Sequence, residues 1–338
     1  MKKRYQLLIS SLTLSGVLFS EIAQADLLIY NGQHKDGGIE QVAAEFTQKT
    51  GIPVKLKYGK SSELAGLLKE EQDKSPADIF VAESTGPFLS LSAEKLLVPI
   101  NADALTNVNS ETIPSASKQD FVPIGVRSRV LAYNPDKVKE SDIPKTWTKM
   151  VNDPAWKNRF SYHPGSGALV DQIAVYKKLH GLEATKAFLA AMKENGQSIK
   201  GHMAALKKID QGDLDVAMIN QYYLYRLYKE KGGADNVKAK IYYMRNGDAD
   251  SALSFSAAGI LRSSQHQSEA QQFITFLTSK AGQELYVQNS AEWPANTQAV
   301  SPVSYLVKLD SLDPPKTSFT TKEESDEAKA LIKEAGIQ

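Results

Sequence analysis

Short apolar runs alternate with helix-like patterns over residues 27–95, and this alternation constrains the fold more than any other feature of the sequence. The expected strands are 27–30, 54–58 and 78–82, and the expected helices are 39–49, 61–73 and 87–95. Gly51 would end the first helix, and Ser61 or Ser62 would cap the second. Strands and helices that alternate in this way build a sheet with helices packed on its faces. The sequence therefore predicts an α/β fold.

A second series of the same kind begins near Phe121. Gly125 is expected to separate two strands, Gly181 to separate two helices, and a capping box of Ser268 and Gln271 to open another helix. The expected strands are 122–124, 126–133, 159–162, 214–219, 241–244 and 253–261, and the other helices are 168–180, 183–195, 203–210, 223–231 and 321–335. Without a long linker between the two series, we predict two lobes between which the chain crosses more than once.

The strands at 121–133 and 253–261 are the candidates for these crossings. Two paired crossing strands would form a hinge over a cleft. Each segment is equally consistent with an ordinary central strand of one lobe.

The first 25 residues have the pattern of a secretory signal peptide. A basic start at Lys2, Lys3 and Arg4 precedes an apolar run, and Ala23-Gln24-Ala25 ends the segment. We expect cleavage after Ala25, with an uncleaved N-terminal anchor as the rival reading. The 313 residues that remain are enough for two domains.

Charge and composition exclude several classes of protein. The 338-residue chain has a net charge of +1, and the mature chain would have −1, so it lacks the basic surplus of a nucleic-acid-binding protein. No later segment approaches the roughly 20 apolar residues of a membrane span, so we expect no stable membrane insertion. The chain has no cysteine, which excludes disulfides, thiolate metal sites, iron–sulfur clusters and a lipidated cysteine. An exported protein without an anchor fits the periplasm, or else secretion into the medium.

Candidate site residues follow the predicted strands, since open α/β sheets bind ligands beyond the carboxyl ends of their strands. They are His34, Glu83, the pair Tyr222-Tyr223, and Ser166-Gly167-Ala168 at a helix start. The N–H groups at a helix start can hold an anion, although Ser166 could equally be a plain helix cap.

Two phenols, a carboxylate and an imidazole form a ligand set that suits a hard cation. A phenol has a pKa of about 10, so its deprotonation requires a strongly charged ion. Two phenolates and one carboxylate would balance the charge of Fe³⁺. The alternatives are that His34 and Glu83 are ordinary surface residues and that Tyr222 and Tyr223 serve packing. The charge balance is consistent with iron without establishing it.

At these residues the chain resembles the periplasmic ferric-ion-binding proteins of bacterial iron ABC transporters, which are class II periplasmic solute-binding proteins. The resemblance covers nearly all of the mature chain and depends on the order and spacing of several short motifs. These motifs are Tyr30-Asn31-Gly32-Gln33-His34, Gly59-Lys60-Ser61 with Leu64-Ala65-Gly66, Pro76-Ala77-Asp78-Ile79-Phe80, Gly125-Val126-Arg127-Ser128-Arg129, Ser166-Gly167-Ala168 and Ile219-Asn220-Gln221-Tyr222-Tyr223.

The resemblance implies a two-lobed binding fold with crossing hinge strands. It implies Fe³⁺ ligands at His34, Glu83, Tyr222 and Tyr223, and a synergistic anion, phosphate or carbonate, held by Ser166, Gly167, Ala168 and Asn220. We expect an N-terminal lobe of residues 26–124 with about 258–310, and a C-terminal lobe of about 125–257 with 311–338. The expected partners are an inner-membrane permease and its ATPase, and the protein itself is expected to be a monomer.

Two positions depart from the family pattern on the anion side of the site. Ser84 stands where a Gln is common, and His202 stands where an Asn is expected. They leave the identity of the anion open.

Two other functions remain as alternatives. A protein of the same fold could bind a small organic anion, such as a phosphonate or carboxylate, without iron. A secreted enzyme is not expected, because the sequence has no Gly-x-Ser-x-Gly and no His-Glu-x-x-His motif.

Overall fold

The computed structural model describes residues 26–35, 37–108, 119–316 and 320–337. The predicted signal peptide, residues 1–25, lies outside the described residues. No helix among the described residues is both long enough and apolar enough to cross a membrane.

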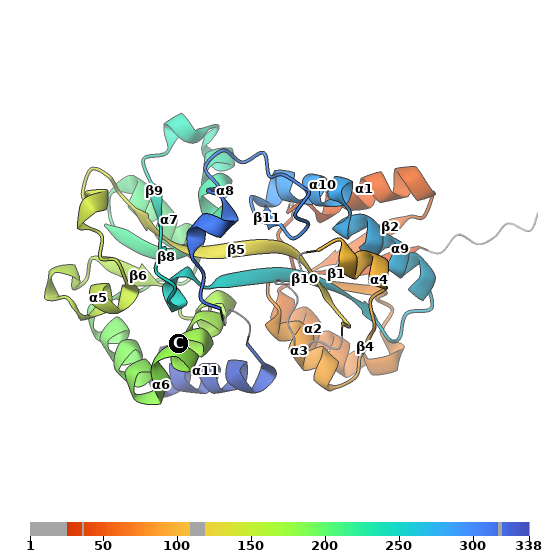
Figure 1. Ribbon diagram of the computed structural model, residues 1–338, viewed down its shortest axis with the longest axis horizontal. Helices are drawn as coiled ribbons and strands as arrows, with labels where there is room; N and C mark the ends of the chain where they lie inside the picture. Colours follow the sequence, from red (N-terminus) through yellow and green to blue (C-terminus); the bar gives the residue numbers. More distant parts are fainter. Residues whose placement is uncertain (1–25, 36, 109–118, 317–319, 338) are drawn as a thin grey trace, which may run out of the picture.

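One mixed sheet runs through both halves of the molecule in the strand order β2-β1-β3-β10-β5-β8-β6-β7 (Figure 1). Off this path, β4 pairs with β10, and β9 and β11 pair with β5. The strands are β1 (Leu27–Asn31), β2 (Val54–Tyr58), β3 (Ile79–Ala82), β4 (Leu97–Val98), β5 (Val122–Tyr133), β6 (Phe160–Tyr162), β7 (Gln197–Ser198), β8 (Val216–Asn220), β9 (Lys240–Tyr243), β10 (Leu253–Leu261) and β11 (Trp293–Pro294). The alternation of strands and helices therefore produces the expected α/β architecture.

Helices cover both faces of this sheet in each half of the molecule (Figure 1). The helices are α1 (Ile39–Thr50), α2 (Ser61–Glu71), α3 (Gly86–Ala93), α4 (Ala102–Thr106), α5 (Trp147–Asn152), α6 (Gly167–Asn195), α7 (His202–Gln211), α8 (Tyr222–Lys231), α9 (Gln267–Thr278), α10 (Lys280–Ser290) and α11 (Lys322–Glu334). We call the half that contains β1–β4, α1–α4, α9 and α10 the first lobe, and the half that contains β6–β9, α5–α8 and α11 the second lobe.

Two long strands, β5 and β10, connect the lobes. They pair antiparallel from Leu253 opposite Ser128 to Ala258 opposite Val122, and β10 also pairs with β3 of the first lobe. The remaining part of β5, from Arg129 to Tyr133, pairs with β8 and β9 of the second lobe. One strand thus belongs to the sheet of both lobes, which is the geometry that the crossing interpretation requires.

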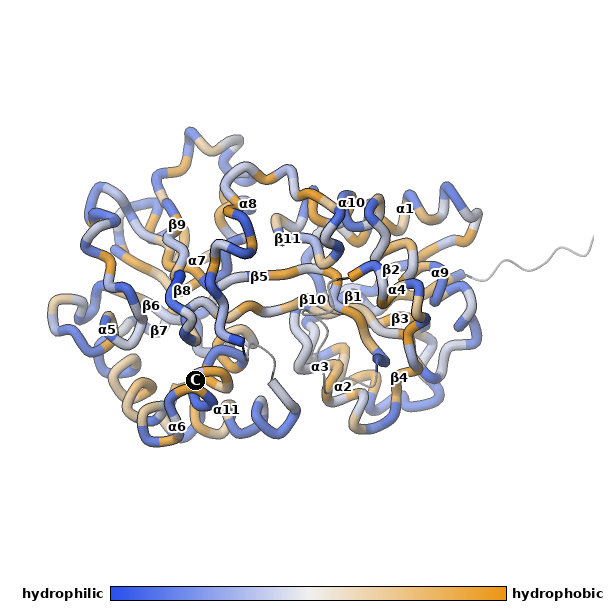
Figure 2. Tube along the Cα trace, viewed as in Figure 1, coloured by the Kyte–Doolittle hydropathy of each residue, from blue (hydrophilic) through white to orange (hydrophobic). Residues whose placement is uncertain are grey.

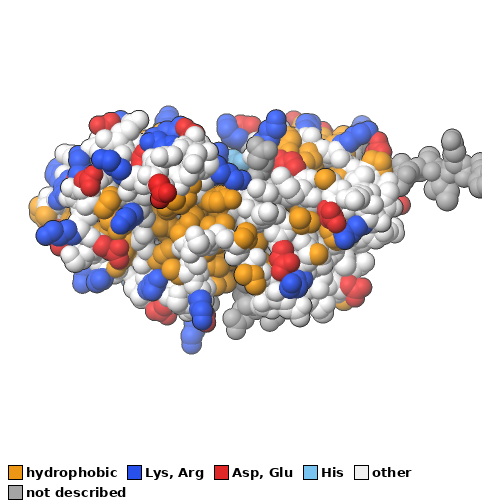
Figure 3. All heavy atoms as spheres, turned by 90° about the horizontal axis from the view of Figure 1, so that it is seen from above, with side chains coloured by type: hydrophobic (Ala, Val, Ile, Leu, Met, Phe, Trp, Pro, Cys, Tyr) orange, Lys and Arg blue, Asp and Glu red, His pale blue; other side chains and the backbone are white. Residues whose placement is uncertain are grey.

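Each lobe buries a hydrophobic core on both faces of its sheet. In the first lobe α1, α9 and α10 cover one core and α2 and α3 cover the other; in the second lobe α5, α6 and α11 cover one and α7 covers the other. Figure 2 shows the apolar residues along the central strands, with polar residues on the outer sides of the helices. Figure 3 shows acidic and basic side chains interspersed on one face, with apolar side chains gathered near its middle.

Three local expectations are wrong. Gly125 does not end a strand, because residues 122–133 form the single strand β5. Ser61 does not cap α2, since its hydroxyl contacts Gly32 and the N–H of Glu83 instead. Ser268 and Gln271 form no capping box, because α9 begins at Gln267 and the Gln271 amide binds the backbone of residues 99 and 101.

Candidate metal centre

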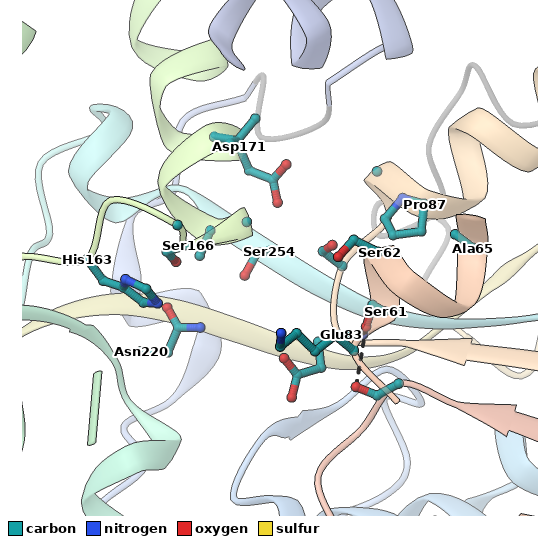
Figure 4. A pocket seen from close by; sticks show the side chains of 18 of the residues that line it. Ser61, Ser62, Ala65, Glu83, Pro87, His163, Ser166, Asp171, Asn220 and Ser254 are labelled. Carbon is teal, nitrogen blue, oxygen red and sulfur yellow. Dashed lines mark hydrogen bonds between the residues drawn. The ribbon is translucent and has the colours of Figure 1, made fainter. Parts of the chain in front are cut away.

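The eight predicted site residues all border one cavity of about 1270 Å³ between the two lobes. They are His34, Glu83, Ser166, Gly167, Ala168, Asn220, Tyr222 and Tyr223. Figure 4 shows Glu83 and Ser61 on the first-lobe side of this cavity and Ser166, His163 and Asn220 on the other side. Ser84 and His202, the two departures from the family pattern, border it as well.

The first-lobe pair, His34 and Glu83, owes its position to neighbouring strand ends. Because β1 and β3 are paired in parallel, the loops that follow them meet at the same edge of the sheet. The hydroxyl of Ser61 joins these loops: it donates to the Gly32 carbonyl (3.3 Å) and accepts from the Glu83 N–H (3.2 Å). A Cβ at Gly32 would lie 2.4 Å from that hydroxyl oxygen, so the close approach requires glycine.

The His34 and Glu83 side chains present two buried atoms toward one point. Nε2 of His34 and Oε1 of Glu83 form an ion pair at 3.0 Å, and neither atom has another hydrogen-bond partner among the described residues. Two donors that bind one metal ion at right angles, each at about 2.1 Å, would be about 3.0 Å apart. The separation of the two atoms and their lack of other partners therefore fit a shared metal ion, which would take the place of their direct contact. Burial alone would raise the pKa of Glu83, but His34 and Arg127 hold it below its usual value.

Tyr222 and Tyr223 lie in the first turn of α8, immediately after β8. Gln221 already has helical dihedrals, so β8 passes into α8 without an irregular turn. The two rings nevertheless lie together, with centroids 4.4 Å apart and planes at 31°. Their centroids are 6.2 and 6.3 Å from that of His34, so residues of both lobes face one position.

Burial controls the protonation of the two phenols. The side chain of Tyr222 is 4% exposed, and burial raises its pKa well above the usual value, with Tyr223 and Glu83 adding to the effect. Burial also raises the pKa of Tyr223. Without a metal, both phenols therefore hold their protons at neutral pH. Among the described residues no three His, Asp or Glu side chains gather to bind a metal, so the phenols must complete any ligand set here.

The start of α6 faces the same cavity with its free N–H groups. Ser166 precedes the helix but does not cap it, because its hydroxyl lies 3.0 Å from Nε2 of His202. The amides of Gly167 and Ala168 are at the helix start, where N–H groups have no partner within the helix. His202 is buried, and burial together with Arg129 and His163 lowers its pKa well below the usual value. The imidazole is thus neutral at physiological pH.

Arg129 is a buried cation behind this position. Its guanidinium donates to Oδ1 of Asn220 (3.0 Å) and to the Met218 carbonyl (3.3 Å). No described carboxylate is within ion-pair distance of it, and burial lowers its pKa to about 10. A buried charge without a counterion is costly, so the surroundings of Asn220 favour an anion.

Two buried residues beside the site were not singled out as site residues from the sequence, namely Arg127 and Arg129. Both lie in β5, whose residues are all buried. Two arginines within a strand that is otherwise largely apolar are the signal that could have found them, because buried arginines require partners.

Comparison with known proteins places this geometry in context. A family model for bacterial extracellular solute-binding proteins matches residues 41–309. The major ferric iron-binding protein of Neisseria meningitidis is 38% identical over 99% of this chain and 98% of its own length. The Fe(3+)-binding periplasmic protein of Serratia marcescens is 33% identical over 98% of this chain and 96% of its own. The structure of iron-bound HitA from Pseudomonas aeruginosa superposes with a TM-score of 0.85 at 36% identity, covering 92% of this chain and 99% of that one.

Proposed function

Because the chain belongs to the bacterial extracellular solute-binding proteins, we propose that it captures ferric ion in its interlobe cleft and delivers it to an iron ABC transporter. The resemblance to periplasmic ferric-ion-binding proteins is confirmed by relatives that match it along nearly the whole chain. These relatives are binding proteins rather than enzymes, and we assign no catalytic step to this chain.

In this proposal Fe³⁺ is the cargo, and four side chains hold it. His34 and Glu83 come from the first lobe, and Tyr222 and Tyr223 from the second. The observation that carries the proposal is the pair of buried atoms, Nε2 of His34 and Oε1 of Glu83, which face each other at 3.0 Å beside two phenols and have no other hydrogen-bond partner among the described residues. Two phenolates and the Glu83 carboxylate would cancel the charge of the ion, so the loaded site would be close to neutral.

The test is the visible spectrum of metal-free protein after addition of Fe³⁺ with phosphate. Phenolate-to-iron charge transfer should colour the wild type, whereas the double variant Tyr222→Phe/Tyr223→Phe should remain colourless. The variant Tyr225→Phe/Tyr228→Phe changes two phenols of the same helix outside the cavity and should colour like the wild type. A folded Tyr222→Phe/Tyr223→Phe protein that still develops the band would overturn the proposal. A wild type that stays colourless would favour the organic-anion carrier without iron.

We also propose that an anion completes the metal site. The N–H groups of Gly167 and Ala168, the Ser166 hydroxyl and the Asn220 amide are neutral groups that recognise charge and shape rather than one compound. Phosphate and carbonate both fit this description. Exchange of phosphate for carbonate or citrate should change the spectrum while some binding persists. Identical spectra and affinities with every anion would show that none is coordinated.

His202 supplies a variant for the same test. It lies beside Ser166 at 3.0 Å, where the family pattern has an Asn. His202→Asn should change the ratio of affinities measured in phosphate and in carbonate. An unchanged ratio would remove His202 from the anion site.

The relatives place the family in the periplasm, and we propose that this chain is exported with cleavage after Ala25, works as a monomer, and serves an inner-membrane permease and its ATPase. N-terminal sequencing of exported protein should begin at Asp26. A sequence that begins at Met1 would contradict the cleavage.

A further inference from the structure

A buried ion pair beside the hinge strands β5 and β10 contacts two of the four proposed ligands, Glu83 and Tyr222, and the residue that precedes a third. Arg127 on β5 and Glu292, just before β11, are 3% and 2% exposed. Nε and Nη2 of Arg127 lie 2.8 and 2.7 Å from Oε1 of Glu292, which is a two-pronged contact. Such a pair is buried at a cost in solvation that often exceeds its gain, so it is weak evidence for a role in stability.

Glu292 is held in turn by both hinge strands and by α10. Its other oxygen accepts from the hydroxyl of Ser256 on β10 at 2.6 Å and from Tyr286 at 3.1 Å. A Cβ at Gly125 on β5 would lie 1.9 Å from that oxygen. The lack of a side chain at Gly125 therefore makes room for this carboxylate. The carboxylate is fixed at the place where β5 and β10 cross between the lobes.

Arg127 also donates to the two loops that carry the first-lobe ligands. Nη1 donates to the carbonyl oxygen of Glu83 at 2.7 Å. Nη2 donates to Oε1 of Gln33 at 3.0 Å, and Gln33 directly precedes His34. The Gln33 amide also donates to the Tyr286 hydroxyl at 3.1 Å, which closes the network around the His34 loop.

The same guanidinium lies against a second-lobe ligand. Its central carbon is 5.0 Å from the ring centroid of Tyr222, within the range of a cation–π contact. One planar group thus contacts the backbone of Glu83, the neighbour of His34 and the ring of Tyr222. Lysine could not replace it, because an ammonium group cannot bind several partners in one fixed plane.

We propose that Arg127, fixed by Glu292, is the positioning residue of the ferric site: it holds the His34 loop, the Glu83 carbonyl and the Tyr222 ring in one arrangement across the hinge. Arg127 does not bind the ion itself. The inference rests on the proposed ferric site and adds a residue pair that sets its geometry.

The test separates positioning from stability with two variants of the whole mature protein. Arg127→Lys keeps the charge and loses the planar contacts, and Arg127→Met/Glu292→Met removes both buried charges together. The control is Arg159→Lys, which makes the same change in an arginine that contacts a carboxylate at 2.7 Å and an aromatic ring at 4.9 Å away from the cavity. For each protein the thermal midpoint without metal, the Fe³⁺ affinity and the charge-transfer band are measured.

We expect both variants to lose at least tenfold in Fe³⁺ affinity and to show a shifted band, while Arg159→Lys keeps both properties. The single variant Arg127→Met, measured beside them, leaves Glu292 as an unpaired buried charge, so the double variant should melt above it. The Fe³⁺ binding of the double variant should nevertheless stay impaired. A folded Arg127→Lys or double variant with wild-type affinity and band would overturn the inference.

If the arginine variants fail to fold, Gln33→Met tests the same inference. It removes one hydrogen bond of Arg127 and leaves the ion pair of Arg127 with Glu292 in place. It should weaken Fe³⁺ binding and shift the band, and wild-type values would again overturn the inference. A wild type that never develops the band would instead refute the proposed function, so the two failures are distinguishable.

Discussion

The phenol oxygens of Tyr222 and Tyr223 distinguish a ligand role from a packing role. If they bind iron, their removal should weaken binding, and if the rings only pack, it should not. Replacement by Phe keeps the ring contacts and deletes only the oxygen. If the oxygens bind the ion, Tyr222→Phe and Tyr223→Phe should each reduce Fe³⁺ affinity at least tenfold, about 1.4 kcal/mol. Tyr228→Phe, which alters a phenol farther along the same helix and outside the cavity, should leave the affinity unchanged. Competition with a chelator of known affinity measures all three, and an unaffected Tyr222→Phe protein would favour packing.

Proton release on iron binding follows from the raised pKa values of the same two phenols. Each holds its proton at neutral pH and must lose it to bind, so affinity should rise with pH as protons compete less. We expect about two protons released per ion from the phenols, and one fewer in Tyr222→Phe or in Tyr223→Phe. Titration in weakly buffered solution counts them. Affinity that falls as the pH rises from 6 to 8 would contradict phenolate ligation.

Asp250 provides a prediction about stability rather than binding. Its side chain is 1% exposed and accepts a hydrogen bond from the Trp147 N–H at 2.8 Å, and burial raises its pKa from 3.8 to about 7. A carboxyl whose pKa is higher in the folded protein contributes stability at low pH, and that contribution is lost as the pH rises toward 7. Asp250→Asn should therefore flatten the decline of unfolding free energy between pH 5 and pH 8. Urea denaturation at both pH values tests it, and an unchanged slope would show that Asp250 does not set this dependence.

At the scale of single elements, α6 depends on one glycine. Gly181 has φ 82° and ψ 174° at a kink that divides the helix, as the sequence predicted when it placed a helix end there. Only glycine adopts this conformation without strain, so Gly181→Ala should lower the free energy of unfolding by about 1–3 kcal/mol. Chemical denaturation measures the loss.

Gly66 gives the matched control for Gly181. It lies inside α2, and a Cβ there would meet nothing within 4 Å. Gly66→Ala should stabilise the protein by about 0.5–1 kcal/mol, because alanine is the better helix former. Equal effects of the two substitutions would mean that the kink imposes no conformational demand.

Helix starts show where local patterns mislead. The pair Ser268 and Gln271 has the spacing of a capping box, but Gln271 instead binds the loop at 99–101. Thr321 and Glu324 do form such a box at the start of α11. A side chain with the spacing of a cap can bind another group that the fold brings near. Such a group is often distant in sequence, so the local pattern does not reveal it.

At the scale of the whole molecule, the proposed ligands come from both lobes, which are joined by β5 and β10 and by contacts such as the packing of α11 against α3. We propose lobe boundaries near residues 124, 257 and 310 on this basis. An ion bound by both lobes binds the closed form better and must shift the protein toward it. Small-angle scattering should show a smaller radius of gyration after Fe³⁺ loading. The Tyr222→Phe/Tyr223→Phe protein, which lacks the second-lobe ligands, should show no such change, and compaction in that variant would contradict the clamp.

The sequence alone, read with the family resemblance that its motifs carry, predicted the α/β class, most strand positions and eight of the residues that border the cleft. Strands β2 and β10 match their predicted limits, because their apolar runs and flanking residues are local properties. The α/β class is confirmed by the two-lobed iron-binding structure that the chain resembles. The candidate residues followed from the rule that ligands lie beyond strand ends, while their role in binding stays a prediction.

Only the tertiary structure showed which residues distant in sequence contact one another. Gly125 was taken for a strand break, but it lies inside β5 and makes room for Glu292, which is 167 positions away along the chain. The contacts of Arg127 with Glu83, Gln33 and Tyr222 likewise join segments that are far apart in sequence. Local periodicity reports which face of an element is buried, whereas the partner of a buried charge is fixed only when the strands have paired. The ligand types could therefore be proposed from the sequence, and the group that positions them could be found only in the folded protein.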